Sequence, residues 1–129
     1  MKAFIVEDSP VIRERLHSMI DGIQDIEHVG DADNEADAVR CIHKTQPDLL
    51  ILDLTLASGN GMEVLRQIRL KAFSGTVIVL TNFGYPQYKK KCMELGADYF
   101  LDKSRDIEMY QWAVLKTWGQ WCRSLYMAK

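Results

Sequence analysis

The sequence has few of the residues that stabilise a chain by means other than a packed core. It contains only three cysteines, an odd number, and Cys41, Cys92 and Cys122 lack the spacing of a metal-binding motif. This excludes disulfide-rich and zinc-finger classes and favours a reducing, cytoplasmic location. Three prolines and eight glycines among 129 residues leave no low-complexity tract or linker, so we expect one domain over residues 1–129.

A strong excess of charge is also absent. The formal net charge is only -2 at pH 7, and without a basic excess we do not expect this chain to bind nucleic acid directly. No apolar run is long enough to span a bilayer, and the first residues lack the pattern of a signal peptide. We therefore expect no membrane association.

What the sequence does contain is a regular alternation of strand-like and helix-like segments. The four clearest apolar runs cover residues 3–6, 49–52, 76–80 and 99–101, and a weaker one covers 27–32. They are short and rich in branched or aromatic residues, as buried strands are. Five strands separated by helices predict a doubly wound α/β fold, in which helices cover both faces of a parallel sheet.

The segments between the strands have helical spacing and clear end signals. Ser9 is a suitable N-cap with Pro10 at the first helical position, and Gly96 is a suitable end for a helix over 86–95. A third helix follows Gly61, and the last extends from about residue 106 to 126. For the second helix, the expected apolar face consists of Ala36, Val39, Ile42 and His43.

Reactive polar residues follow most of the predicted strands. Glu7 and Asp8 follow the first, Asp53 follows 49–52, Thr81 follows 76–80 and Lys103 follows the last. Because the carboxyl ends of parallel strands meet at one edge of a sheet, these side chains should converge. Carboxylates gathered there repel one another unless a cation is present, and Mg²⁺ prefers such oxygen ligands. The set is typical of a phosphoryl-transfer site.

At this point the sequence resembles the receiver domains of bacterial two-component response regulators, of the chemotaxis-regulator type. The resemblance covers residue 1 to about residue 118 and depends on five motifs in register. They are FIVEDS at 4–9, LILDL at 50–54, GMEVL at 61–65, VLT at 79–81 and GADYFLDK at 96–103. The resemblance implies a flavodoxin-like, five-stranded sheet in the order 2-1-3-4-5.

The resemblance also implies a role for each site residue and a class of partner. Asp53 would accept a phosphoryl group from a histidine kinase or a histidine phosphotransfer protein, so the domain signals rather than acting as an enzyme. The implied Mg²⁺ ligands are Asp53, Asp8, Glu7 through a water, and the backbone carbonyl of Thr55. The residues implied to hold the phosphoryl oxygens are Thr81 and Lys103, and the implied switch pair is Thr81 with Phe100.

Three positions depart from the family pattern. Ala57 and Ser104 stand where the family often has proline, and we therefore expect a trans peptide bond after Lys103. Asn82 replaces a smaller residue, which affects access to Asp53. None of the three changes removes a reactive group.

Other functions remain open at this stage. A haloacid-dehalogenase-type phosphatase would need a second aspartate at position 55, which is Thr55, and a flavin-binding relative would need a less acidic loop after the first strand. A receiver-like interaction module that is never phosphorylated, or the receiver part of a longer transcription regulator, fits the same residues.

Two further features have no place in the phosphorylation site. His17, His28 and His43 belong to no motif, and we interpret them as structural or exposed to solvent. The last helix continues its apolar stripe beyond the usual end of a receiver. Trp118, Trp121 and Tyr126 are therefore expected to contact a downstream partner or a second copy of this chain, the alternative being that this extension packs on its own domain.

Overall fold

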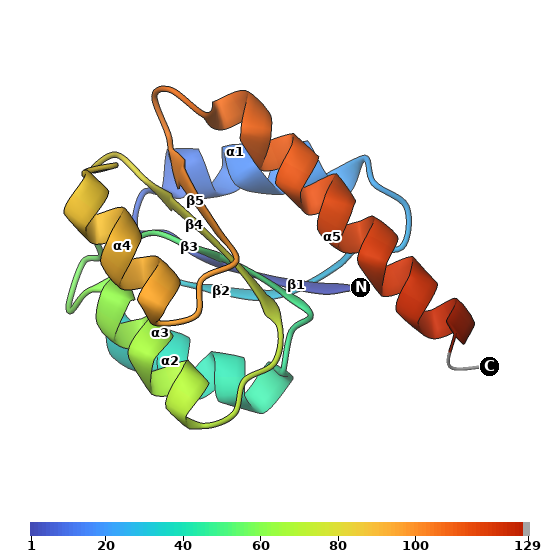
Figure 1. The fold of residues 1–129 in the computed structure, drawn as a ribbon, viewed down its shortest axis with the longest axis horizontal. Coiled ribbons are helices and arrows are strands. Elements are labelled where there is room, and N and C mark those ends of the chain that lie inside the picture. The colour runs from blue at the N-terminus through green and yellow to red at the C-terminus, as the bar shows by residue number, and fades with distance from the viewer. Residues whose placement is uncertain (128–129) are drawn as a thin grey trace.

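The computed structural model describes residues 1–127, in which five strands and five helices alternate (Figure 1). The elements in chain order are β1 (Lys2–Val6), α1 (Pro10–Asp21), β2 (Glu27–Ala32), α2 (Glu35–Thr45), β3 (Leu49–Leu52), α3 (Gly61–Leu70), β4 (Thr76–Thr81), α4 (Pro86–Glu94), β5 (Tyr99–Asp102) and α5 (Ile107–Met127).

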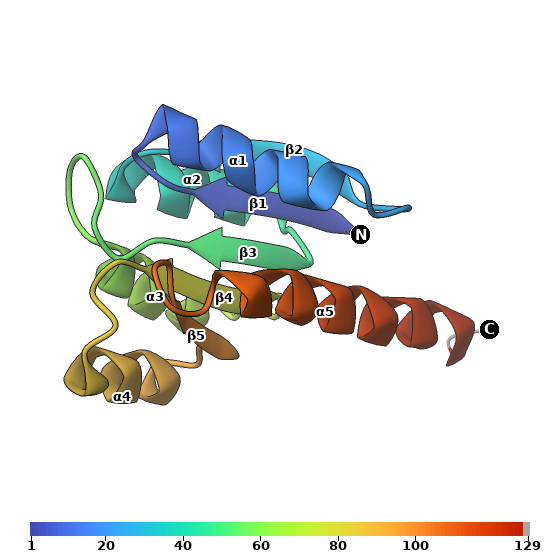
Figure 2. The ribbon, with the colours of Figure 1, turned by 90° about the horizontal axis from the view of Figure 1, so that it is seen from above.

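All five strands belong to one parallel sheet with the order β2-β1-β3-β4-β5. Figures 1 and 2 show α1 and α5 on one face of this sheet and α2, α3 and α4 on the other. The predicted doubly wound fold and its strand order are confirmed. The order changes direction at β1 and β3, and the site described below lies at the carboxyl ends of these strands.

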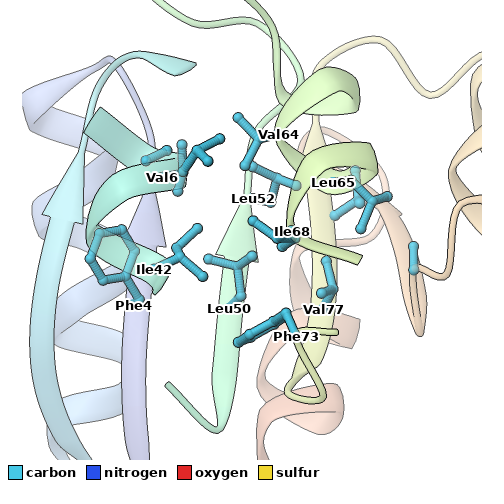
Figure 3. Packing of buried hydrophobic residues seen from close by; sticks show 14 of the residues in the cluster. Phe4, Val6, Ile42, Leu50, Leu52, Val64, Leu65, Ile68, Phe73 and Val77 are labelled. Carbon is cyan, nitrogen blue, oxygen red and sulfur yellow. The ribbon is translucent and has the colours of Figure 1, made fainter. Parts of the chain in front are cut away.

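Alternating strand residues fill two separate cores, one on each face of the sheet. The α1/α5 core contains Ala3, Ile5, Leu49, Ile51, Ile78 and Leu80 from the strands, with Leu16, Ile20, Tyr110, Ala113 and Val114 from the helices. The α2/α3/α4 core contains Phe4, Val6, Leu50, Leu52, Val77 and Val79 from the strands, packed on helix residues such as Ile42, Val64, Leu65 and Ile68 (Figure 3). Both faces of the central strands are therefore buried, which fixes their register.

Helix ends follow the expected capping chemistry. The Ser9 hydroxyl accepts a hydrogen bond from the Ile12 N–H at 3.3 Å, and Pro10 begins α1 as predicted. Asn34 and Asn60 cap α2 and α3 in the same way. After α4, Gly96 has a φ of 98°, the left-handed conformation that ends many helices.

The predicted face of α2 is partly wrong. Val39 and Ile42 are buried as expected, but Ala36 and His43 are exposed and Ala38 is buried instead. The helix begins at Glu35, after its Asn34 cap, and its rotation about its own axis is set by the side chains of α3 and the sheet below it. Apolar spacing alone did not reveal that rotation.

The last helix passes beyond the sheet in Figure 2, yet its tryptophans contact the body of the domain. Trp118 and Trp121 are half-buried and pack on the α1/α5 core, so for these two residues the structure favours intramolecular packing over the expected contact with a partner. By contrast, Leu125, Tyr126 and Met127 are exposed. No helix within residues 1–127 is both long and apolar enough to cross a membrane.

We predict that Trp118→Ala lowers the free energy of unfolding by about 2 kcal/mol, because it removes an aromatic ring from the edge of a core. Tyr126→Ala is the matched control on the same helix. The Tyr126 side chain is exposed, and its loss should change that free energy by less than about 0.5 kcal/mol. Urea denaturation of the two variants measures both values, and equal losses would contradict this assignment of the helix surface.

Candidate functional site

The reactive side chains identified in the sequence meet at the carboxyl edge of the sheet. Glu7 follows β1, Asp53 follows β3, Thr81 is the last residue of β4 and Lys103 follows β5. Glu7, Asp53 and Lys103 line a small cavity of about 150 Å³. The other residues that line it are Asp8, Ser9, Ile12, Thr55, Asn82 and Phe83. Strand order thus brings Glu7, Asp53 and Lys103 together, as predicted, whereas Thr81 is fully buried and does not line the cavity.

Three carboxylates form the floor of this cavity. Glu7, Asp8 and Asp53 each offer an oxygen, and these oxygens lie within 4.8 Å of one another. Glu7 and Asp53 are almost fully buried, at 1% and 5% exposure, whereas Asp8 is half-buried. A mixture of buried and accessible carboxylates allows a cation to enter from solvent and to keep several of its waters, which is how Mg²⁺ is usually held.

Lys103 is the positive charge of the site. Its Nζ donates one hydrogen bond to Asp53 Oδ2 at 2.9 Å and another to Glu7 Oε1, and only 9% of its side chain is exposed. One ammonium faces three carboxylates, so the ionised cluster carries an excess of negative charge. The donor set and this excess charge fit a hard divalent cation.

The buried charges shift the pKa values of Glu7 and Lys103. Burial, together with the charge of Asp53, raises the pKa of Glu7 to about 7 although its hydrogen bond with Lys103 opposes the shift. For Lys103, burial alone would lower the pKa, but the hydrogen bonds to Glu7 and Asp53 outweigh it and the pKa is raised. Lys103 therefore stays protonated, while Glu7 binds a proton easily when no metal ion is present.

The backbone around Asp53 is held closely. Its N–H donates to the Val6 carbonyl at 3.0 Å, and its Oδ1 accepts from the Thr55 N–H at 3.3 Å. A Cβ at Gly61, the first residue of α3, would lie 2.0 Å from the Asp53 carbonyl oxygen. Only glycine permits α3 to begin so close to the strand that carries Asp53.

The two residues expected to act as a switch lie on the same face of the sheet. Thr81 is fully buried, its Oγ1 accepts from the Phe83 N–H at 3.2 Å, and its carbonyl accepts from the Lys103 N–H at 2.9 Å. Phe100 is half-buried against the α2/α3/α4 core and pairs in register with Val79, two residues before Thr81.

Two further findings concern the surroundings of the site. No peptide bond within residues 1–127 is cis, which confirms the expectation for the bond after Lys103. An apolar groove of about 530 Å³ beside Thr55 was not foreseen. It is lined by Leu54, Thr55, Asn60, Met62, Phe83, Tyr85 and Tyr88. Its aromatic lining is visible in the sequence only as three closely spaced residues, Phe83, Tyr85 and Tyr88, that belong to none of the motifs above.

The raised pKa of Glu7 predicts a pH dependence of stability in the absence of divalent cations. A carboxyl pKa of about 7 in the folded state, above its ordinary 4.5, means that the folded state binds the proton more tightly. Stability should therefore fall as the pH rises from about 4.5 to above 7, by on the order of 3 kcal/mol from this group. Glu7→Gln should remove this part of the profile.

Denaturant unfolding at several pH values, in chelator, measures the difference between the wild type and Glu7→Gln. The control is Glu14→Gln on α1, where the side chain is exposed and the profile should run parallel to that of the wild type. A Glu7→Gln profile that also runs parallel to the wild type would contradict the assignment.

Comparison with known proteins gives a consistent picture. The family model for the response regulator receiver domain matches residues 3–114. The transcriptional regulatory protein YvfU of Bacillus subtilis is 31% identical over 108 residues, which cover 84% of this chain and 54% of the relative. The nitrate/nitrite response regulator protein NarL of Escherichia coli is 30% identical over 104 residues, which cover 81% of this chain and 48% of NarL. The chain thus spans about half the length of these relatives.

Solved structures agree with this comparison. A DNA-binding response regulator of the LuxR family from Staphylococcus aureus superposes with a TM-score of 0.81 at 32% identity, covering 90% of this chain and 97% of the other. A two-component response regulator of the same family from Aurantimonas superposes with a TM-score of 0.81 at 27% identity, covering 92% and 85%. Because the family match extends over residues 3–114 and these structures share the fold, the chain belongs to the response regulator receiver domain family.

Proposed function

We propose that this chain accepts a phosphoryl group on Asp53 in a Mg²⁺-dependent reaction and changes conformation as a result. The observation that carries the proposal is the buried Asp53 carboxylate, hydrogen-bonded to Lys103 and accompanied by Glu7 and Asp8. Receiver domains are signalling domains that accept phosphoryl groups rather than classical enzymes, and they pair with histidine kinases.

The metal ion would be held by the carboxylates of Asp8 and Asp53, by Glu7 through a water, and by the backbone carbonyl of Thr55. When bound, Mg²⁺ would neutralise charge on the carboxylates and on the phosphoryl oxygens. The cluster of oxygens within 4.8 Å and the half-buried position of Asp8 support this assignment.

In the transfer step, an oxygen of Asp53 forms a bond to phosphorus while the bond from phosphorus to the donor imidazole nitrogen breaks. The donor nitrogen keeps the electron pair of that bond. Lys103 already donates to Asp53 Oδ2, so its ammonium lies where it can turn to a phosphoryl oxygen. The Thr81 hydroxyl, which is fully buried, would donate to another after moving toward the cavity. Catalysis of this kind is mostly positioning and charge neutralisation.

The donor would be a histidine kinase or a histidine phosphotransfer protein in the cytoplasm. YvfU is named as a transcriptional regulatory protein, and both named relatives are about twice as long as the matched region. The signal would therefore pass to an effector in a longer protein or to a separate partner. The exposed tip of α5, at Leu125, Tyr126 and Met127, offers one surface for a downstream protein or a second copy.

We predict that incubation with a small-molecule phosphodonor and Mg²⁺ adds one phosphoryl group, measured by intact-mass spectrometry. Asp53→Asn and chelation of Mg²⁺ should both abolish the addition, because they remove the nucleophile and the neutralising charge. Asp21→Asn, at the exposed end of α1, is the matched control and should be labelled like the wild type. An unmodified wild type under conditions that label a known receiver would favour an interaction module that is never phosphorylated.

Lys103→Ala distinguishes the role of the Lys103 ammonium from the role of the Mg²⁺ ion. Because Lys103 would contact the phosphoryl group rather than the metal ion, this variant should retain Mg²⁺ binding but lose most of the phosphorylation. Lys89→Ala, on the exposed face of α4, is its control. Wild-type phosphorylation of Lys103→Ala would refute the role assigned to the lysine.

The proposed switch makes a separate prediction. In the phosphorylated state, the Thr81 hydroxyl should move toward a phosphoryl oxygen and Phe100 should turn inward into the space that it leaves. The energy for this change must come from contacts made only in that state. Because Thr81 Oγ1 also accepts from Phe83, the loop after β4 should move with it.

Structures with and without a phosphoryl mimic test the switch directly. Thr81→Val keeps the shape of the side chain without its hydroxyl, so it should still be phosphorylated on Asp53 but should leave Phe100 in place. If Thr81 and Phe100 are unmoved in the wild type with the mimic bound, the switch is wrong although the phosphorylation site stands.

A further inference from the structure

A second cluster of metal-ligating side chains lies away from the acidic site, between α1 and the edge strand β2. His17 comes from α1, and His28 and Asp31 come from β2; one ligand atom of each lies within 4.8 Å of the others. The side chains of the two histidines are 20% and 29% exposed, and that of Asp31 is 41% exposed. A small ion can therefore reach them from solvent.

An irregularity in β2 places His28 and Asp31 together. Residues three apart in a regular strand point to opposite faces of the sheet. Here Ala3 pairs with His28 and Phe4 pairs with Gly30, so Val29 is an extra residue, and Ile5 then pairs with Asp31. Because Ala3 and Ile5 both face α1, this bulge turns His28 and Asp31 to the face that also carries His17.

The distances suit a common cation. His17 Nε2 lies 3.5 Å from Asp31 Oδ2, and His28 Nε2 lies 4.0 Å from the same oxygen. Two ligand atoms bound tetrahedrally to one Zn²⁺ at about 2.1 Å lie about 3.4 Å apart. The two imidazole rings are in edge contact, with centroids 3.7 Å apart. Only small side-chain rotations would bring all three ligand atoms around one ion.

The charges around the cluster include one competitor. Arg13 Nε lies 3.8 Å from Asp31 Oδ2, but this separation is too long for a hydrogen bond, and the guanidinium instead donates to the Glu7 carbonyl at 2.9 Å. Within residues 1–127, Asp31 Oδ2 therefore accepts no hydrogen bond from a guanidinium or ammonium group, and its other near partners are the two histidines.

We propose that His17, His28 and Asp31 form a second metal site, which binds a late first-row divalent cation such as Zn²⁺ through two imidazole nitrogens and one carboxylate oxygen. Imidazole ligands suit zinc, nickel and copper rather than Mg²⁺, so this site differs in chemistry from the oxygen-lined acidic cluster. Water completes the coordination at the exposed side. The bound ion ties α1 to β2. This inference does not depend on phosphorylation of Asp53.

The test is calorimetric titration of Zn²⁺ into the full chain with Mg²⁺ in excess, in a background in which Cys41 and Cys122 are replaced by serine. The excess Mg²⁺ occupies the acidic cluster, and the serines remove the partly exposed thiols. We expect one equivalent to bind. His17→Ala, His28→Ala and Asp31→Asn should each weaken binding at least about tenfold, because each removes one of three protein ligands. His43→Ala, at an exposed histidine on α2, should bind like the parent.

Nuclear magnetic resonance of the imidazole groups gives an independent reading that does not require any variant to fold. One equivalent of Zn²⁺ should shift the ring signals of His17 and His28 and leave those of His43 in place. Binding that is unchanged in His17→Ala and His28→Ala, or signals of these two rings that do not shift, would overturn the proposal. Loss of phosphorylation in Asp53→Asn with Zn²⁺ binding retained would separate this site from the acidic one.

Discussion

The two hydrogen bonds of the Lys103 ammonium are the contacts on which the arrangement of the site depends. They join Lys103 to Glu7, 96 residues away, and to Asp53, 50 residues away. Charged groups as buried as these are stable only when paired, because each loses its hydration on folding. The lysine therefore holds the loop after β5 against the ends of β1 and β3 and keeps two like charges close together. Without it, the carboxylates would repel one another.

The sheet makes this concentration of charge possible. Each central strand is buried on both faces, and its alternate side chains enter two different cores. A slip of one residue would move every side chain into the wrong core, so the register of the strand is fixed. Reactive residues can then be confined to the ends of strands, where the chain leaves the core and the side chain reaches the cavity. The buried residues before Asp53, from Leu49 to Leu52, fix the backbone that carries it, and the hydrogen bond from Lys103 holds its side chain.

The sequence predicted the elements that have strong local signals and the site that topology assembles from them. Lys103 and Asp53 follow short apolar runs that are typical of buried parallel strands, and the family motifs placed them in register. Sequence patterns do not reveal contacts that depend on other parts of the chain. No pattern indicated that His28 and Asp31 lie together, because a bulge at Val29 is visible only in the pairing with β1. Ala36 was placed on a buried face because the rotation of α2 depends on α3.

The close approach of Gly61 to Asp53 restricts the backbone after β3 on one side. No side chain fits between the start of α3 and the Asp53 carbonyl, where even a methyl group would overlap the oxygen. The Asp53 backbone therefore cannot move toward α3, and its N–H is also hydrogen-bonded to the Val6 carbonyl at the end of β1. Under the proposed function, a new group on Asp53 would then be accommodated by side chains and by the segments after β4 and β5. The domain would divide into a fixed part that holds the nucleophile and a part that responds to it.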